Sequence, residues 1–227
     1  MNLNREAYQM KYQEGYGITI PEGYFIRCYK QILEYECKVT GGAVLDFGMG
    51  NGTHLKWLLG QPQNWDVYGC DIAELAVSAA RKLLRDVDPK HFVCIERQDN
   101  IKEIFKIKFD LILANQVLYY MDQLELQSVI DDFYQLLNPG GIIFVSMMSD
   151  ENYYFSRSKP INGTSLRRVR LTGRLNEDTD INFKNTSQLV DDFRAFKRIQ
   201  VGYYDTSIRE DEGSTKHIFF VGSKPNA

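Results

Sequence analysis

The chain of 227 residues contains 44% hydrophobic, 25% charged and 13% aromatic residues. Its length favours a single α/β domain, and its apolar fraction is large enough to bury a core, which excludes wholesale disorder. Lys and Arg together number 27 and Asp and Glu number 30, so the formal net charge is −3. That balance argues against a dedicated nucleic-acid binder, because phosphate contacts need an excess of basic residues.

The sequence carries no signal for a membrane or a metal. No apolar run approaches the roughly 20 residues that span a bilayer, and the first residues lack the apolar core of a signal peptide. No C-x-x-C pair is present, so we expect free, buried thiols and neither a zinc site nor a disulfide framework. The cysteines concerned are Cys28, Cys37, Cys70 and Cys94. These features favour the reducing cytoplasm.

Strand and helix periods alternate through the first two thirds of the chain. Apolar residues at helical spacing predict an amphipathic helix over 22–36. Helices are also expected at 53–59 and 73–85, and a longer one follows Asp122, which forms a capping-box pattern with Glu125. This alternation indicates a parallel sheet with right-handed crossovers. Its strands are predicted over 43–47, 65–70, 92–96, 109–114 and 142–147.

The alternation stops after residue 148. Residues 149–180 are polar and without clear period, and a loop of that length in a compact domain is usually functional or disordered. We therefore interpret 149–181 as an insertion over the functional site, and 1–38 as an N-terminal cap segment of the same domain. A final helix is expected at 186–195. The short acidic link between the last two predicted strands, 196–204 and 216–222, forces them antiparallel.

Polar or glycine-rich residues mark four predicted strand ends, where open α/β sheets bind their ligands. Glycines after the first strand let the backbone approach a ligand, and the helix that follows near Thr53 points free N–H groups at an anion. An acid after the second strand suits the hydroxyls of a ribose. A side-chain acid or amide after the third can accept from an adenine amino group. The residues are Gly48, Gly50, Gly52, Asp71, Asp99, Asn100, Asn115 and Gln116.

Two details distinguish among nucleoside ligands. The glycine spacing is G-x-G-x-G, whereas dinucleotide-binding folds carry G-x-G-x-x-G. Asp46 lies inside the first strand, where it would repel a pyrophosphate but can orient the ammonium group of an amino-acid tail. An adenosine with a methionine tail is S-adenosylmethionine, which we expect as the cofactor.

Four segments in register resemble the motifs of class I S-adenosylmethionine-dependent methyltransferases. The glycine-rich segment 44–52 looks like their first motif, and 68–71, 109–115 and 136–141 are similar to the later ones. The resemblance implies a Rossmann-like, doubly wound, mostly parallel sheet of seven strands. Its last strand is antiparallel and inserted between strands five and six.

The resemblance also implies roles for single residues. Asp46 and the glycine loop of Gly48, Gly50 and Gly52 would hold the methionine part of the cofactor. Asp71 would bind the ribose hydroxyls, and Ile72 would pack on the adenine. Asp99, with its neighbour Asn100, would meet the adenine amino group. Asn115 and Gln116 would line the pocket near the sulfonium.

Tyrosines and polar residues dominate the two segments expected around the methyl acceptor. Such a pocket suits a small, polar, ring-shaped acceptor such as a sugar. The basic residues of the insertion could hold the phosphate of a nucleotide-activated sugar. The chain is also similar to methyltransferases of bacterial surface-polysaccharide pathways, which favours sugar O-methylation. The predicted substrate contacts are Tyr16, Tyr24, Arg27, Tyr120, Asn152 and Tyr153.

Candidates for a catalytic base are few. Tyr119 and His217 are predicted at the functional edge of the sheet, whereas His54 and His91 are interpreted as structural. Other acceptors stay open: N- or O-methylation of another small metabolite and, less favoured, of RNA. A dehydrogenase that uses NAD is the alternative from a different class of enzyme. A homodimer stays one option.

Overall fold

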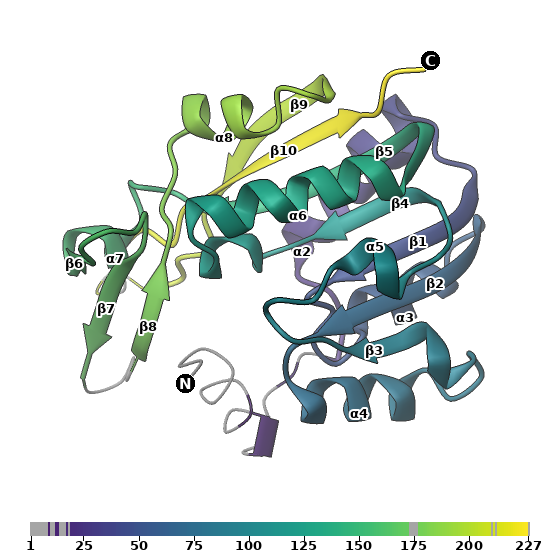
Figure 1. The fold of residues 1–227 in the computed structure, drawn as a ribbon, viewed down its shortest axis with the longest axis horizontal. Coiled ribbons are helices and arrows are strands. Elements are labelled where there is room, and N and C mark those ends of the chain that lie inside the picture. Colours follow the sequence, from purple (N-terminus) through teal and green to yellow (C-terminus); the bar gives the residue numbers. More distant parts are fainter. Residues whose placement is uncertain are drawn as a thin grey trace.

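The computed structural model describes residues 9, 12–13, 17, 19–172, 177–209, 211 and 213–226. In this part of the chain a sheet of seven strands forms the centre, in the order β3-β2-β1-β4-β5-β10-β9 (Figure 1). Its strands are β1 (Gly41–Phe47), β2 (Asn64–Asp71), β3 (Phe92–Cys94), β4 (Phe109–Ala114), β5 (Leu137–Met148), β9 (Lys197–Tyr204) and β10 (His217–Ser223).

The topology confirms the predicted fold class. Strands β1 to β5 pair in parallel, and β10 runs antiparallel to both of its neighbours, β5 and β9. The last strand is therefore inserted between the fifth and sixth strands of the sheet. Because β10 is reversed, its first residue lies where the parallel strands end: His217 pairs with Met148 at the end of β5.

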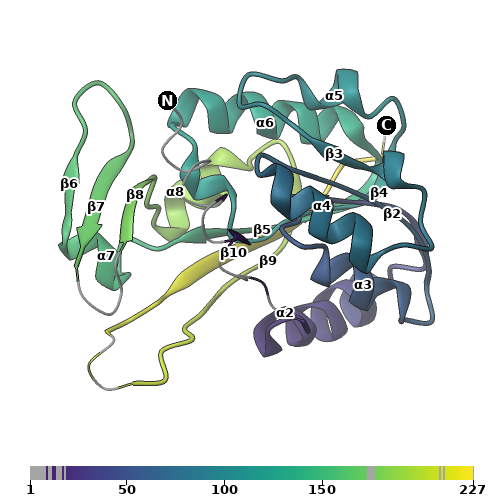
Figure 2. The same cartoon turned by 90° about the horizontal axis from the view of Figure 1, so that it is seen from below.

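Helices cover both faces of the sheet (Figure 2). One face packs against α2 (Gly23–Cys28), α3 (Thr53–Leu59) and α4 (Glu74–Leu83), and the other against α5 (Ile101–Ile104), α6 (Gln123–Leu136) and α8 (Thr186–Asp192). Neighbouring strand residues belong to different cores, because successive side chains point to opposite faces. Val44 packs with Leu58 on the first face, and Leu45 with Phe133 on the second.

The predicted helix after Asp122 has the capping box that the sequence indicated. The Asp122 side chain accepts from the backbone N–H groups of Leu124 and Glu125, and the Glu125 side chain accepts from the N–H of Asp122. These bonds satisfy N–H groups that a helix start otherwise leaves unpaired. They fix where α6 begins, immediately after the loop that follows β4.

Three element boundaries differ from the sequence prediction. The first helix is α-helical only to Cys28 and continues as a π-helix, η1 (Tyr29–Glu36). The short helix α5 was not predicted. Strand β5 begins at Leu137, which pairs with Phe109 of β4, and so includes the Pro-Gly-Gly segment. Gly140 and Gly141 exchange backbone hydrogen bonds with Lys224 at 2.9 Å each.

The expectation of an irregular loop over 149–180 was wrong. After helix α7 (Tyr153–Ser156) the chain forms a three-stranded antiparallel sheet of β6 (Ser158–Pro160), β7 (Arg167–Leu171) and β8 (Glu177–Ile181). This small sheet stands apart from the central one (Figures 1 and 2). In β7 and β8 the buried residues Val169, Thr179 and Ile181 alternate with charged ones. The charged residues pair across the strands: Arg168 faces Asp180 and Arg170 faces Asp178.

Candidate functional site

The glycine loop between β1 and α3 wraps around the end of β2. Gly48 and Met49 donate backbone hydrogen bonds of 2.8 and 3.0 Å to the carbonyl of Cys70. Gly48 and Gly50 have φ values of +75° and +55°, in the left-handed region that favours glycine. A Cβ on Gly48 would collide with Val117, in the loop after β4. The glycine loop and that second loop are therefore in direct contact.

Asp71, at the end of β2, organises the glycine loop. Its two carboxylate oxygens accept from the backbone N–H groups of Gly50, at 3.0 Å, and Ala73, at 2.9 Å. Burial raises the pKa of the Asp71 carboxyl above its usual range, and the neighbouring Asp46 adds to the increase. The two backbone hydrogen bonds oppose that shift. A ligand that donates to this carboxylate would oppose it further.

Asp46, in β1, is a buried carboxylate with incomplete hydrogen bonding. Its side chain is 1% exposed, and its Oδ2 has no hydrogen-bond partner among the residues that the structure describes. His54 places Nδ1 at 3.5 Å from that oxygen, and the His54 ring stacks on Phe25 with centroids 4.1 Å apart. A buried acceptor without a donor is costly, so this position suits a cationic donor such as an ammonium group.

One cavity joins most of the predicted cofactor residues. It is lined by Gly48, Gly50, Asp71, Ile72, Asn115 and Gln116, together with Tyr119, Tyr120 and, from the N-terminal segment, Tyr12, Gly17 and Glu22. A second, adjoining cavity shares Gly48, Asp71 and Ile72 and adds Arg97. Arg97 forms an ion pair with Glu125, at the start of α6. Gly52 caps α3 just outside these linings.

Asp99 and Asn100 line neither cavity in the described structure. Asp99 accepts from the backbone N–H of Glu96 at 2.8 Å, and Asn100 caps α5 by accepting from Lys102 at 3.2 Å. Both side chains thus serve the local turn, and their contact with an adenine stays a prediction. Arg97, which was not predicted from the sequence, lines the second cavity instead. No sequence motif indicates this role, because the position of the side chain depends on an ion pair with Glu125 in a distant helix.

The predicted substrate contacts are scattered. Tyr120 lines the cavity, whereas Tyr16 lies outside the described residues. Tyr24 uses its hydroxyl to bind Asn115 and Gln116. The other three side chains do not line the cavity: Arg27 is exposed, Asn152 caps α7, and the ring of Tyr153 packs under the guanidinium of Arg157 at 3.6 Å.

His217 and Tyr119 lie together at the functional edge of the sheet. Their ring centroids are 5.7 Å apart, and the His217 ring stacks on Tyr204 at 5.2 Å. The His217 Nδ1 is 2.7 Å from the carbonyl of Thr215, so it carries the hydrogen of the neutral ring. Burial lowers the pKa of His217 to about 4. Its buried Nε2 has no hydrogen-bond partner within the described ranges.

Residues 45–143 match the model of a family described as "Methyltransferase domain". The matched segment runs from β1 into β5 and includes the glycine loop, Asp71 and Asn115. The segment 45–143 is therefore a methyltransferase domain, with S-adenosylmethionine as its cofactor. The match sets aside the NAD-dependent dehydrogenase considered from the sequence. Which residues of the site hold the ammonium group and the ribose of that cofactor stays a prediction from the sequence.

Solved structures show the same fold at low sequence identity. A methyltransferase from Methanosarcina mazei has a TM-score of 0.67 at 15% identity, over 86% of this chain and 98% of that one. A second from Clostridium acetobutylicum has 0.61 at 15%, over 89% and 98%. The N-methyltransferase NodS from Bradyrhizobium japonicum has 0.63 at 16%, over 96% and 98%.

No curated protein is significantly similar in sequence to this chain. Among the described residues, no helix combines the length and the apolar composition that crossing a membrane requires.

Replacing Asp71 tests its role in holding the cofactor. We expect Asp71→Ala to weaken binding of S-adenosylhomocysteine by about 1 to 3 kcal/mol in calorimetry, because a charged hydrogen-bond partner is lost. Asp66→Ala is the matched control on the same strand, since the Asp66 carboxylate is exposed and bonded to the Tyr68 hydroxyl at 2.9 Å. Unchanged affinity in Asp71→Ala would count against the ribose role.

The raised pKa of Asp71 gives binding a pH dependence. Unfolded, this carboxyl has a pKa of about 3.9, so the folded chain holds its proton to higher pH and loses stability as pH rises through the raised pKa. Hydroxyl donors of a ligand favour the ionised form. Affinity for S-adenosylhomocysteine should therefore increase as pH rises through that pKa, in titrations between pH 4 and 8. The same increase in Asp71→Ala would assign it to another group.

Proposed function

We propose that this methyltransferase transfers the methyl group to a hydroxyl of a small polar acceptor, most simply a sugar. The observation that supports this choice is the composition of the cavity wall. The lining includes tyrosines, an amide and a carboxylate: Tyr12, Tyr119, Tyr120, Gln116 and Glu22. Aromatic rings and hydrogen-bonding groups of this kind match the flat faces and hydroxyls of a sugar ring.

Different residues of the site would serve different parts of the proposed reaction. S-adenosylmethionine supplies an electrophilic methyl group on its sulfonium. Asp46 and the glycine loop would hold its amino-acid end, Asp71 its ribose, and Ile72 its adenine. The tyrosines of the lining would orient the acceptor and exclude water, which is the main contribution a protein makes to such a transfer.

We propose His217 as the group that receives the proton of the acceptor hydroxyl. With Nδ1 bonded to Thr215, the lone pair of the neutral ring resides on Nε2, and a pKa of about 4 keeps the ring neutral at pH 7. His217 lies behind Tyr119, which lines the cavity. A base must come within hydrogen-bond reach of the hydroxyl, and such contacts often tighten only when substrate is bound.

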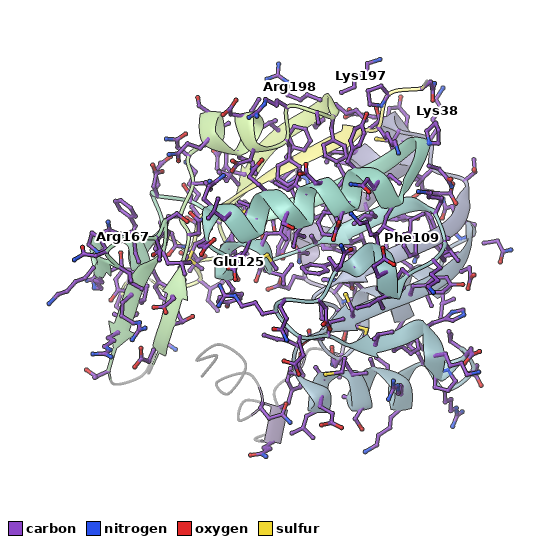
Figure 3. The ribbon with its side chains drawn as sticks, viewed as in Figure 1. Lys38, Phe109, Glu125, Arg167, Lys197 and Arg198 are labelled. Atoms are coloured by element: carbon purple, nitrogen blue, oxygen red, sulfur yellow. The ribbon has the colours of Figure 1, made fainter. Side chains whose placement is uncertain are left out.

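The arginines of the insertion are engaged in the small sheet. Arg168 pairs with Asp180, and Arg170 with Asp178. Arg167, visible on the small sheet in Figure 3, donates to the Ser158 hydroxyl at 2.7 Å. A nucleotide-activated sugar would need cations for its phosphates, and these side chains already have partners. We therefore favour a sugar that does not depend on them for recognition.

An amine acceptor is the second candidate, favoured by Glu22. This exposed carboxylate lies at the cavity, where an ammonium group could approach it. One protein of the same fold, NodS, is an N-methyltransferase. RNA is less favoured, because the cavity lacks a basic rim: among its described lining residues there is no Lys or Arg.

A screen for homocysteine release tests the acceptor class. The full chain would be incubated with S-adenosylmethionine and, separately, with free sugars and glycosides, nucleotide sugars, phenols, amines and RNA. We expect turnover with sugars above the rate without acceptor. Activity confined to amines would move the assignment to N-methylation, and activity confined to RNA would contradict a small-molecule acceptor.

Replacing His217 tests the base. We expect His217→Asn to lower kcat by about 100-fold, the range for general-base catalysis, with little change in cofactor binding. Because only the neutral ring accepts a proton, the wild-type rate should be flat above about pH 5 and fall as pH drops through 4. His91→Asn is the control, since His91 packs on Tyr68 at 3.9 Å, outside the cavity. An unchanged kcat in His217→Asn would exclude this role.

A further inference from the structure

Hydrogen bonds link four side chains from distant parts of the chain beside the cofactor cavity, and the side-chain amide of Gln116 closes them into a ring. Asn115 donates from Nδ2 to the Tyr24 hydroxyl at 2.8 Å. The Tyr204 hydroxyl donates to Ser146 at 3.3 Å. The Ser146 hydroxyl donates back to Oδ1 of Asn115 at 2.8 Å. The Tyr24 and Tyr204 hydroxyls share a donor, Nε2 of Gln116.

Gln116 is attached to the same ring by three bonds. Its backbone N–H donates to Ser146 at 2.8 Å, and its Nε2 donates to the hydroxyls of Tyr24 at 2.7 Å and Tyr204 at 3.2 Å. Both hydrogens of the side-chain amide are then used. Gln116 also has a φ of +55°, which is uncommon for a residue with a Cβ and must be held by its surroundings.

The two tyrosines act as fixed, neutral hydrogen-bonding groups. Burial is the main cause that raises the pKa of both Tyr24 and Tyr204 above the usual range, so neither ionises near neutral pH. Their rings stack in parallel, with centroids 3.6 Å apart. The Tyr24 hydroxyl already accepts from two amides, which occupies both of its lone pairs.

The ring connects two walls of the cavity. Asn115 and Gln116 form one wall, and Val117 of the same loop touches the glycine loop at Gly48. Tyr24 is in the first turn of α2, and the residues just before that helix, Gly17 and Glu22, line the cavity from the other side. Tyr24 is thus the point at which the N-terminal segment is tied to the loop after β4.

We propose that Tyr24 is a positioning residue for the cofactor cavity, acting through Asn115 and Gln116 and not by contact with the substrate. Together with Tyr204 and Ser146 it holds the loop after β4 in its left-handed conformation and seats α2 beside it. The proposal concerns the cofactor cavity alone, so it stands or falls independently of which acceptor the enzyme methylates.

The test compares two tyrosines of the same N-terminal helical segment. We expect Tyr24→Phe, which keeps the stack on Tyr204, to weaken S-adenosylhomocysteine binding about tenfold in calorimetry. Tyr29→Phe is the control: the fully buried Tyr29 hydroxyl accepts from Trp65 at 3.0 Å and lies outside the cavity lining. Tyr29→Phe should have a lower free energy of unfolding in denaturant. Its affinity for S-adenosylhomocysteine should stay within about twofold of the wild type.

A second variant keeps the proposal testable if the first is poorly folded. Tyr204→Phe breaks the same ring and should weaken binding by a similar factor. Both changes disrupt the same hydrogen-bonded ring. The affinity of the double variant for S-adenosylhomocysteine should therefore be about tenfold lower than that of the wild type, and not about a hundredfold lower. Wild-type affinity in both single variants, equal weakening in Tyr29→Phe, or additive losses in the double variant would each overturn the proposal.

Discussion

Two carboxylates at the ends of neighbouring parallel strands, one buried and one half-buried, are the constraint on which this site depends. The pairing of β1 with β2 aligns Asp46 with Gly69, so Asp46 and Asp71 end up close enough for one to raise the pKa of the other. Burying charge is costly unless donors surround it. Backbone N–H groups bond Asp71, but Oδ2 of Asp46 has none among the described residues. The fold therefore leaves a negative site that a ligand with cationic and hydroxyl donors stabilises.

The central part of the fold could be predicted because its signals are local. Each buried strand is a short apolar run, and each run ends at a polar or glycine residue that the parallel topology brings to one edge. The capping box at Asp122 and the glycine loop depend only on neighbours within a few residues. Even the antiparallel last strand followed from a short link. The cavity lining accordingly contains most of the residues expected to bind the cofactor.

What could not be predicted depends on contacts between distant segments. The pairing of β7 with β8 brings together residues such as Arg168 and Asp180, 12 positions apart. Arg97 lines the adjoining cavity and forms an ion pair with Glu125 in α6. Asp99 and Asn100 have residue types that suit an adenine, but their turn uses them first. Residue type alone does not tell whether a side chain is already engaged by its own backbone.

The proton of the acceptor has few destinations in this cavity, and that bears on the kind of acceptor. Tyr24 and Tyr204 stay protonated and hydrogen-bonded, so they take no part in proton transfer. A hydroxyl acceptor needs a neutral base, and the buried imidazole of His217 has the required free lone pair on Nε2. An amine arrives protonated and must lose a proton before it attacks, for which an exposed carboxylate such as Glu22 and the adjacent solvent suffice. The buried histidine, which packs against a residue of the cavity lining, and the exposed glutamate of that lining thus favour different chemistries.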